Sequence, residues 1–341
     1  MKVLFTPHLP HYTIGLTKEL AKHVDIKILT TQKYNTPAKH LPIPNIPKLR
    51  GLIKITVLKT AGLFYDIVHA NTSQEAIHCL NKNKLIVTEH GYPDPQVAGP
   101  KYEYYMKEKQ ALIALHEAGV PIIAISNFAA KMLKEKIGVK AHKVIYHGLL
   151  EQFKTNTPKK LDLTKPPVIL WVSRLIQLKE PFIFLQALTK LANKTEYKAI
   201  MVGDGPLKNQ ILQYIKKHGL KNKITLKTKI PFHQMPTIYS KATILVHTSR
   251  IEAFGFSVLE AMGIGLPVIV PKAGGAYEVA GQAAITFTPG NPTELAEKIT
   301  QILTDPEQYH KQSQKSIQRA QQFTWTKTAQ QYLQEYKKLH H

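Results

Sequence analysis

Two glutamates, Glu252 and Glu260, have seven residues between them in a stretch where a strand-like pattern gives way to a helix-like one. The apolar, β-branched segment 242–249 is typical of a buried strand, and the segment 257–262 is typical of a short helix. Glu252 is therefore predicted just outside a helix N-terminus, with Glu260 about one turn inside it.

The helix N-terminus and the two carboxylates could each bind a different chemical group. The unpaired N–H groups and positive dipole end of a helix suit a phosphate, and carboxylates accept hydrogen bonds from sugar hydroxyl groups. Acids near a helix start are also common simply because they are solvated or favour the dipole. The spacing alone does not decide between these two interpretations.

The wider pattern around the two glutamates is more specific than their spacing. Its members are Ser249, Glu252, Gly255, Phe256, Leu259, Glu260, Ala261, Met262, Gly265, Pro267, Val268, Gly274, Gly275 and Glu278. This pattern closely resembles the signature of the group 1 (family four) glycosyltransferases, which are retaining nucleotide-sugar transferases of the GT-B fold.

The resemblance implies roles for particular residues. Arg174 and Lys179, in SRLIQLKE, match the family's cation pair, which balances the charge of a diphosphate through a planar fork and a compact point charge. Glu252 would bind the sugar, Glu260 the ribose, and His90 would touch the transferred sugar. The implied catalytic residues are His90, Arg174, Lys179 and Glu252. The implied donor-binding residues are Gly15, Arg174, Lys179, Phe254, Gly255, Phe256, Ser257 and Glu260.

Two positions depart from the family pattern. Ser173 replaces the glycine before Arg174, and the loop from Pro7 to Gly15 has one glycine where the family usually carries a double glycine. Ligands of open α/β sheets bind at the carboxyl ends of strands, where this loop lies. The role of the loop is therefore left open.

Strand-like and helix-like segments alternate along the chain, which predicts an α/β protein with doubly wound parallel sheets. With the resemblance, this becomes a GT-B fold of two Rossmann-like domains with a cleft between them. We expect an acceptor-side domain over 1–153, a polar, Pro-rich linker over 154–167 and a donor-side domain over 168–322. Residues 323–341 are expected to form a C-terminal helix that crosses back to the N-terminal domain.

The composition of the 341 residues is that of a globular protein, with 43% hydrophobic and 20% charged residues. Cys79 is the single cysteine, so no internal disulfide can form, which fits a reducing compartment. No apolar run reaches the roughly 18 residues of a membrane span, and the N-terminus lacks a signal-peptide pattern. A cytoplasmic location is expected.

The formal net charge is +23, which favours polyanions such as nucleic acid or anionic lipid. In segment 48–64 the cations Lys48, Arg50, Lys54 and Lys59 are interleaved with apolar residues. As a helix this segment would suit the surface of an anionic membrane at the inner face, although the pattern slightly favours an ordinary helix packed on the sheet with its lysines in water.

The resulting hypothesis is a retaining, metal-independent glycosyltransferase that moves a hexose from a UDP- or GDP-hexose to a lipid-linked or glycan acceptor. No metal site and no further cofactor are expected, because the sequence has no D-x-D motif and the cations and helix amides would stabilise the leaving diphosphate. A nucleotide-sugar epimerase of the same fold is an alternative. A basic nucleic-acid-binding protein is a further one, but no aromatic-interleaved basic platform or recognition motif is present, so no nucleic-acid partner is expected.

Overall fold

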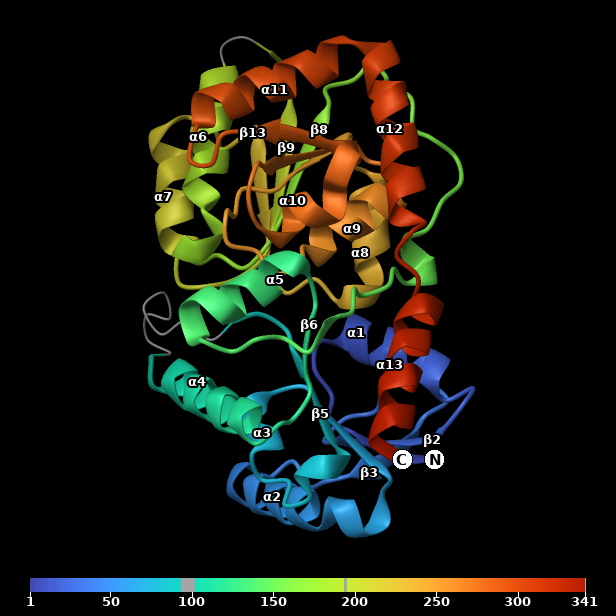
Figure 1. Cartoon of the computed structure of the whole chain (residues 1–341). Coiled ribbons are helices and arrows are strands. Elements are labelled where there is room, and N and C mark those ends of the chain that lie inside the picture. The colour runs from blue at the N-terminus through green and yellow to red at the C-terminus, as the bar shows by residue number, and fades with distance from the viewer. Residues whose placement is uncertain (93–101, 193–194, 341) are drawn as a thin grey trace. The chain divides into compact units, whose positions relative to one another are not determined.

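The chain divides into two compact units in a computed structural model that describes residues 1–92, 102–192 and 195–340 (Figure 1). Unit 1 contains Met1–Leu150 and Phe323–His341, and unit 2 contains Glu151–Gln322. Within the described residues, no helix is long and apolar enough to cross a bilayer.

Unit 1 contains a parallel sheet with the strand order β3-β2-β1-β4-β5-β6-β7. The strands are β1 (Lys2–Phe5), β2 (Asp25–Thr30), β3 (Lys39–Pro42), β4 (Ile67–Ala70), β5 (Leu85–Glu89), β6 (Ile122–Ala124) and β7 (Lys143–Val144). The helices are α1 (Pro10–Leu20), α2 (Pro47–Phe64), α3 (Ser73–Ala76), α4 (Tyr102–Glu117), α5 (Asn127–Met132) and α13 (Trp325–His340).

Unit 2 contains a second parallel sheet, with the order β10-β9-β8-β11-β12-β13. The strands are β8 (Val168–Val172), β9 (Lys198–Val202), β10 (Ile224–Lys227), β11 (Ile244–Val246), β12 (Val268–Pro271) and β13 (Ala284–Phe287). The helices are α6 (Pro181–Leu191), α7 (Lys208–Lys217), α8 (Met235–Ser240), α9 (Phe256–Gly263), α10 (Gly274–Ala280), α11 (Pro292–Thr304) and α12 (Pro306–Ala320).

Both sheets follow the doubly wound order, in which the chain runs outward from the first strand, returns and continues on its other side. Central strands such as β4 and β12 are buried along their whole length, because helices cover both faces of a parallel sheet. The prediction of two Rossmann-like α/β domains is confirmed. The order reverses between β1 and β4 in unit 1 and between β8 and β11 in unit 2, so ligand sites are expected beyond the carboxyl ends of those strands.

The segment 154–167, predicted as a linker, contains no helix or strand and is held on unit 2. The backbone N–H of Lys159 donates to Ser313 Oγ at 2.8 Å, and Lys159 Nζ donates to the carbonyl oxygen of Ser240 at 2.7 Å. These contacts fix the segment along the surface of unit 2.

Helix α13 returns to unit 1 and packs against α1, as the red and blue helices in Figure 1 show. Trp325, at the first turn of α13, lies directly against Gly15 in the middle of α1, where a Cβ would be only 2.1 Å from Trp325 Cε2. Further along α13, Tyr336 Oη lies 2.6 Å from Nδ1 of the buried His69 on β4. The structure therefore gives Gly15 a packing role, and its role in donor binding stays a prediction.

Two elements differ from the sequence pattern. Segment 73–81, whose sequence pattern is that of a helix, forms only one helical turn, α3, since the chain tightens after Ala76, where the backbone N–H of Cys79 donates to the carbonyl oxygen of Ala76 at 3.0 Å. By contrast, α2 is helical through β-branched Ile55, because Leu58 and Ala61 on one side of it are buried, and such tertiary packing outweighs the weak helix propensity.

We expect Gly15→Ala to lower the free energy of unfolding by roughly 1–3 kcal/mol, because the added methyl group overpacks the contact with Trp325. Gly51→Ala is the matched control, since Gly51 is also a helical glycine but has no atom within 4 Å of the added Cβ. The control should be stabilised by about 0.5–1 kcal/mol through helix propensity alone. Urea unfolding measures both, and equal effects at the two positions would contradict the packing role.

Candidate functional site

The candidate site of unit 2 is formed by the loops that follow β8 and β11, the two strands at which the sheet order reverses. The β8 loop carries Arg174 and ends in a 3₁₀ turn, Gln177–Lys179. The β11 loop runs from His247 to Gly255, where α9 begins. The predicted cations and the predicted Glu252 therefore meet at one edge of the sheet.

Hydroxyl side chains tie these two loops together. Thr248 Oγ1 donates to the carbonyl oxygen of Lys179, and Ser249 Oγ donates to that of Leu178, both at 2.8 Å. The indole Nε1–H of buried Trp171 donates to Thr248 Oγ1 at 2.9 Å. The backbone that carries Lys179 is thus fixed by the start of the β11 loop.

An ion pair joins the two loops at the centre of the site. Lys179 Nζ lies 2.7 Å from Glu252 Oε2, and the two side chains are only 10% and 20% exposed. Burial alone would raise the pKa of Glu252, but Lys179, together with His247 and Arg174, holds that pKa below its usual value. Glu252 is therefore ionised at neutral pH and able to accept hydrogen bonds.

Two glycines at the start of α10 pack against the backbone of the Glu252 loop. The N–H of Gly275 donates to the carbonyl oxygen of Glu252 at 2.6 Å, and a Cβ on Gly275 would lie 2.2 Å from the carbonyl oxygen of Ala253. Gly274 has a φ of 80° and lies against the backbone of Arg250. The double glycine in the sequence pattern is explained by this close backbone contact.

The N-terminus of α9 adds a positive end to the site. Gly255 precedes it with a φ of 96°, and as the N-cap residue it offers no side chain to cap this end of the helix. The backbone amides of Phe256 and Ser257 belong to the first turn, while Phe254 is buried with its ring centroid 5.1 Å from that of Phe256. A helix start whose N-cap residue is glycine, next to a loop that holds a lysine, is suited to a phosphate.

Glu260 lies inside α9 and has an environment opposite to that of Glu252. It is 7% exposed, and Tyr239 on α8 donates its hydroxyl hydrogen to Glu260 Oε2 at 2.8 Å. Burial raises the pKa of Glu260 to about 8, although the hydrogen bond from Tyr239 opposes the shift. One glutamate of the pair is thus held ionised, and the other is largely protonated at neutral pH.

Arg174 is exposed and sits at the beginning of the β8 loop. Gly203, which follows β9, packs so closely below this loop that a Cβ would lie 1.8 Å from the carbonyl oxygen of Ser173. Arg174 acts on Glu252 through its charge, lowering the pKa of the carboxyl group. It is the exposed cation of the site, whereas Lys179 is the buried one.

The second group of predicted residues lies in unit 1, again where its sheet order reverses. His90 Nε2 lies 3.0 Å from Asn71 Oδ1, after β4, and the His90 ring stacks on that of His8, after β1, at 3.9 Å between centroids. Burial lowers the pKa of His90 well below its usual value, with neighbouring histidines adding to the effect, and it lowers that of His8 to about 4. His90 is therefore a neutral imidazole that can donate or accept one hydrogen bond.

Three residues that lie close to the predicted site residues were not singled out from the sequence. Tyr239 holds Glu260, His247 lies 3.9 Å from Glu252, and Asn71 contacts His90. Of these, only His247 has a sequence signal, because it directly precedes the glutamate pattern at the end of a predicted strand. Within the described ranges, no group of three or more His, Cys, Asp or Glu side chains is arranged to hold a metal ion.

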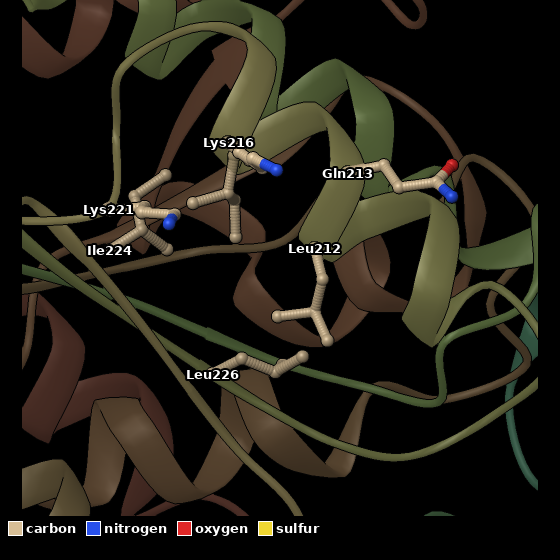
Figure 2. A pocket seen from close by; sticks show the side chains of 7 residues that line it. Leu212, Gln213, Lys216, Lys221, Ile224 and Leu226 are labelled. Atoms are coloured by element: carbon tan, nitrogen blue, oxygen red, sulfur yellow. The ribbon is translucent and has the colours of Figure 1, made fainter.

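A groove of about 540 Å³ lies elsewhere in unit 2, between α7 and the edge strand β10 (Figure 2). The side chains of Leu212 and Leu226 approach each other across it, and Lys216 and Lys221 border it. None of the residues of the candidate site lines this groove.

The chain is similar in sequence and in fold to known glycosyltransferases. The family model described as "Glycosyl transferases group 1" matches residues 153–319, which contain the whole unit 2 site. An uncharacterized glycosyltransferase of Methanocaldococcus jannaschii is 25% identical over 351 residues, covering 96% of this chain and 94% of the relative. The D-inositol 3-phosphate glycosyltransferase of Corynebacterium urealyticum is 28% identical over 182 residues, covering 50% and 43%.

Among solved structures, Anabaena HepE in complex with UDP and glucose superimposes with a TM-score of 0.79 at 22% identity, covering 99% of this chain and all of the other. Sucrose-phosphate synthase from Thermosynechococcus elongatus gives 0.78 at 20% identity, covering 99% and 98%. The fold and the sequence matches together define a glycosyltransferase with the GT-B fold. Residues 153–319 match the group 1 glycosyltransferase family, so the family resemblance and the assignment as an enzyme are confirmed.

The opposite environments of the two glutamates predict opposite effects on stability. The pKa of Glu260 is about 8 in the folded chain against 4.5 when unperturbed, so the folded state binds more protons between these values and its stability falls as pH rises. Glu260→Gln removes this penalty. We expect the variant to be more stable than the parent by roughly 1–3 kcal/mol at pH 7, and equally stable below about pH 4, where the glutamate is protonated in both states.

Glu252→Gln is the matched control for this measurement. Here the pKa of Glu252 is lowered, and the substitution leaves the buried Lys179 without its ion partner, so the free energy of unfolding should fall by roughly 1–3 kcal/mol at pH 7. Urea unfolding at several pH values measures both variants. A loss of stability in both variants of similar size would contradict the assigned protonation states.

Proposed function

We propose that this enzyme is a retaining, metal-independent glycosyltransferase that transfers a hexose from a UDP- or GDP-hexose to a lipid-linked or glycan acceptor. The observation that carries the proposal is the ion pair of Lys179 and Glu252 in the loops that precede α9, whose N-cap residue is Gly255. It sets a cation and a helix dipole next to an ionised carboxylate, which matches a diphosphate joined to a sugar.

In this reaction the bond between the anomeric carbon and the phosphate oxygen breaks, and negative charge grows on the nucleoside diphosphate. Lys179, Arg174 and the amides at Phe256 and Ser257 would stabilise that charge, and each preorganised donor would lower the activation free energy by about 3 kcal/mol. These groups supply the positive charge for which other transferases use a divalent ion. Retention of configuration rests on the family resemblance of the glutamate pattern.

The two carboxyl groups would have separate tasks. Glu252 would accept hydrogen bonds from sugar hydroxyl groups, and its negative charge would favour the electron-poor ring that forms as the bond breaks. Glu260 would bind the ribose hydroxyl groups, which are unchanged by the reaction. We propose, following the family pattern, that His90 touches the transferred sugar and that Gly15 contributes to donor binding from its place in α1.

The two glutamates therefore predict different kinetic effects. Glu260→Gln should weaken donor and free nucleoside diphosphate by similar factors, because the ribose contact is uniform between ground and transition states. Glu252→Gln should leave nucleoside diphosphate affinity nearly unchanged and lower turnover by roughly 100-fold. Calorimetric titration with UDP and GDP, beside donor turnover with and without acceptor, all in EDTA, measures both effects.

The reverse result, in which Glu252→Gln loses nucleotide affinity and Glu260→Gln loses only turnover, would contradict the assignment of the two tasks. Donor consumption without transfer to any acceptor would favour the epimerase alternative. No binding of either nucleotide by the parent chain in EDTA, with binding restored by magnesium, would contradict the metal-free mechanism.

A lipid-linked acceptor would lie at a membrane surface, and α2 fits such a surface. Leu52, Leu63 and Phe64 are 66%, 80% and 68% exposed, and Arg50 and Lys59 are exposed on the same helix. The side chain of Lys48 lies outside the described part of the structure. We propose that α2 attaches the enzyme peripherally to anionic lipid, with each cation near the surface contributing about 1 kcal/mol.

The chain should float with vesicles that contain phosphatidylglycerol, less so at high salt, and not with neutral phosphatidylcholine vesicles. Replacing Leu63 and Phe64 by serine should reduce flotation at least tenfold, since two exposed apolar side chains would no longer enter the interface. Leu212→Ser, which changes an exposed leucine on α7 of unit 2, is the control and should float like the parent. Equal flotation of both variants would contradict a docking role for α2.

A further inference from the structure

The outer edge of the second sheet, at β10, is a part of unit 2 that the proposed function leaves unused. β10 is the last strand of its sheet and pairs only with β9 among the residues that the structure describes. The carbonyl oxygens of Lys223 and Lys227 accept hydrogen bonds from the β9 side, from the N–H groups of Ala199 and Gly203. The backbone groups of β10 that point the other way therefore have no strand beside them.

These outward groups come from Ile224 and Leu226, because neighbouring residues of a strand direct their backbone groups to opposite sides. The N–H of Ile224 closes a turn onto the carbonyl oxygen of Leu220 at 2.9 Å. The carbonyl oxygen of Ile224 and both backbone groups of Leu226 remain. An edge of this kind is a template for one more strand.

The apolar groove between α7 and β10 borders the same edge (Figure 2). Ile224 and Leu226 are two positions apart on β10, so both side chains lie on the groove side of the sheet, and Leu212 lines the groove from α7. Leu212 is 45% exposed. A strand added to β10 would direct every second side chain into the groove, where apolar residues would cover this leucine.

The groove lies in a part of the chain that carries only positive charge. The segment 205–251 contains no Asp or Glu. Seven lysines belong to α7, to β10 and to the loops that flank them: Lys208, Lys216, Lys217, Lys221, Lys223, Lys227 and Lys229. None of them forms an ion pair with another residue of the described ranges. Their charges are therefore available to an acidic partner.

The order of residues along β10 indicates how the charges of a partner should be arranged. Lys223 and Lys227 alternate with Ile224 and Leu226, so their side chains lie on the face of the sheet opposite the groove. Side chains that face each other on neighbouring strands stabilise a sheet when their charges are opposite. The matching segment alternates apolar residues, which enter the groove, with acidic residues, which lie beside the two lysines.

We propose that this edge of unit 2 docks a partner protein through an extended acidic segment, which adds a strand beside β10 and places its apolar side chains in the groove against α7. A second copy of this chain is disfavoured as the occupant, because it would bring seven more lysines to the contact. An anionic lipid could fill the groove with its acyl chains, but it would leave the outward backbone groups of β10 without partners.

The test uses a fluorescein-labelled peptide of about ten residues that alternates glutamate and valine, and measures its fluorescence anisotropy with the parent chain. We expect saturable one-to-one binding that weakens at high salt, since exposed charges contribute to it. Of two further peptides, N-methylated at every valine or at every glutamate, at least one should bind about tenfold more weakly, because one set of N–H groups faces β10. Unchanged binding of both would contradict strand addition.

Two variants test the surface itself. Lys221→Glu combined with Lys223→Glu should weaken peptide binding about tenfold by charge reversal, and Leu212→Glu should weaken it similarly by placing a carboxylate in the groove. Lys311→Glu combined with Lys315→Glu changes the net charge equally at two exposed positions of α12 and should bind the peptide like the parent. Urea unfolding checks that each variant is folded, and Leu212→Glu, at an exposed position, serves if the double variant is not.

The other occupants have distinct signatures, and each of them would overturn the proposal. Equal binding of a peptide that alternates lysine and valine, or no binding of the acidic peptide by the parent, would show that the edge does not select an acidic strand. Loss of vesicle flotation in the Lys221 and Lys223 double variant would assign the groove to anionic lipid. Self-association of the parent that Leu212→Glu abolishes would assign it to a second copy of the chain.

Discussion

The ion pair between Lys179 and Glu252 is the interaction on which the rest of the site depends. It joins the loops after β8 and β11, and it decides that Glu252 is charged although the side chain is mostly buried. The neighbouring features serve this contact. Thr248 and Ser249 fix the lysine backbone, and Gly275 holds the backbone of Glu252 from the other side.

Two carboxyl groups eight positions apart are thereby given different chemistry by their surroundings alone. Glu252 has a cation at its oxygen and keeps a low pKa, whereas Glu260 has a neutral hydroxyl group at its oxygen and a pKa of about 8. A charged group suits the sugar, where positive charge develops, and a group with a hydrogen-bonding hydroxyl partner suits a ribose that does not react. The buried Glu260 destabilises the folded chain, and this free-energy penalty grows as the pH rises from the unfolded towards the folded pKa of the residue.

The alternation of strands and helices was sufficient to predict both parallel sheets, because buried parallel strands are continuous apolar runs that stand out from amphipathic helices. The glutamate pattern was sufficient to predict that Lys179, Glu252 and Gly255 come together, since the order of strands brings their loops to one edge. The helical state of α2 was left open by the sequence, because tertiary burial of Leu58 and Ala61 decided it.

Contacts made only by tertiary packing could not be predicted. Tyr239 reaches Glu260 from a helix 21 residues away in sequence, and no spacing rule links such positions. Gly15 was expected at the donor, but the structure shows Trp325, more than 300 residues later, filling the space at its Cα. His247 looked like the end of a strand, and only the distance to Glu252 distinguishes it from an ordinary core residue.

The central claim is that Lys179 binds the diphosphate. Its most direct test is a titration of UDP and GDP into the parent chain and into Lys179→Met, in EDTA and under conditions in which both proteins are fully folded. The methionine keeps the length and apolar character of the lysine but has no charge for a diphosphate. We expect one of the two nucleotides to bind the parent with one-to-one stoichiometry and the variant to bind it at least tenfold more weakly. Equal affinity of parent and variant would show that the diphosphate lies elsewhere and would contradict the account.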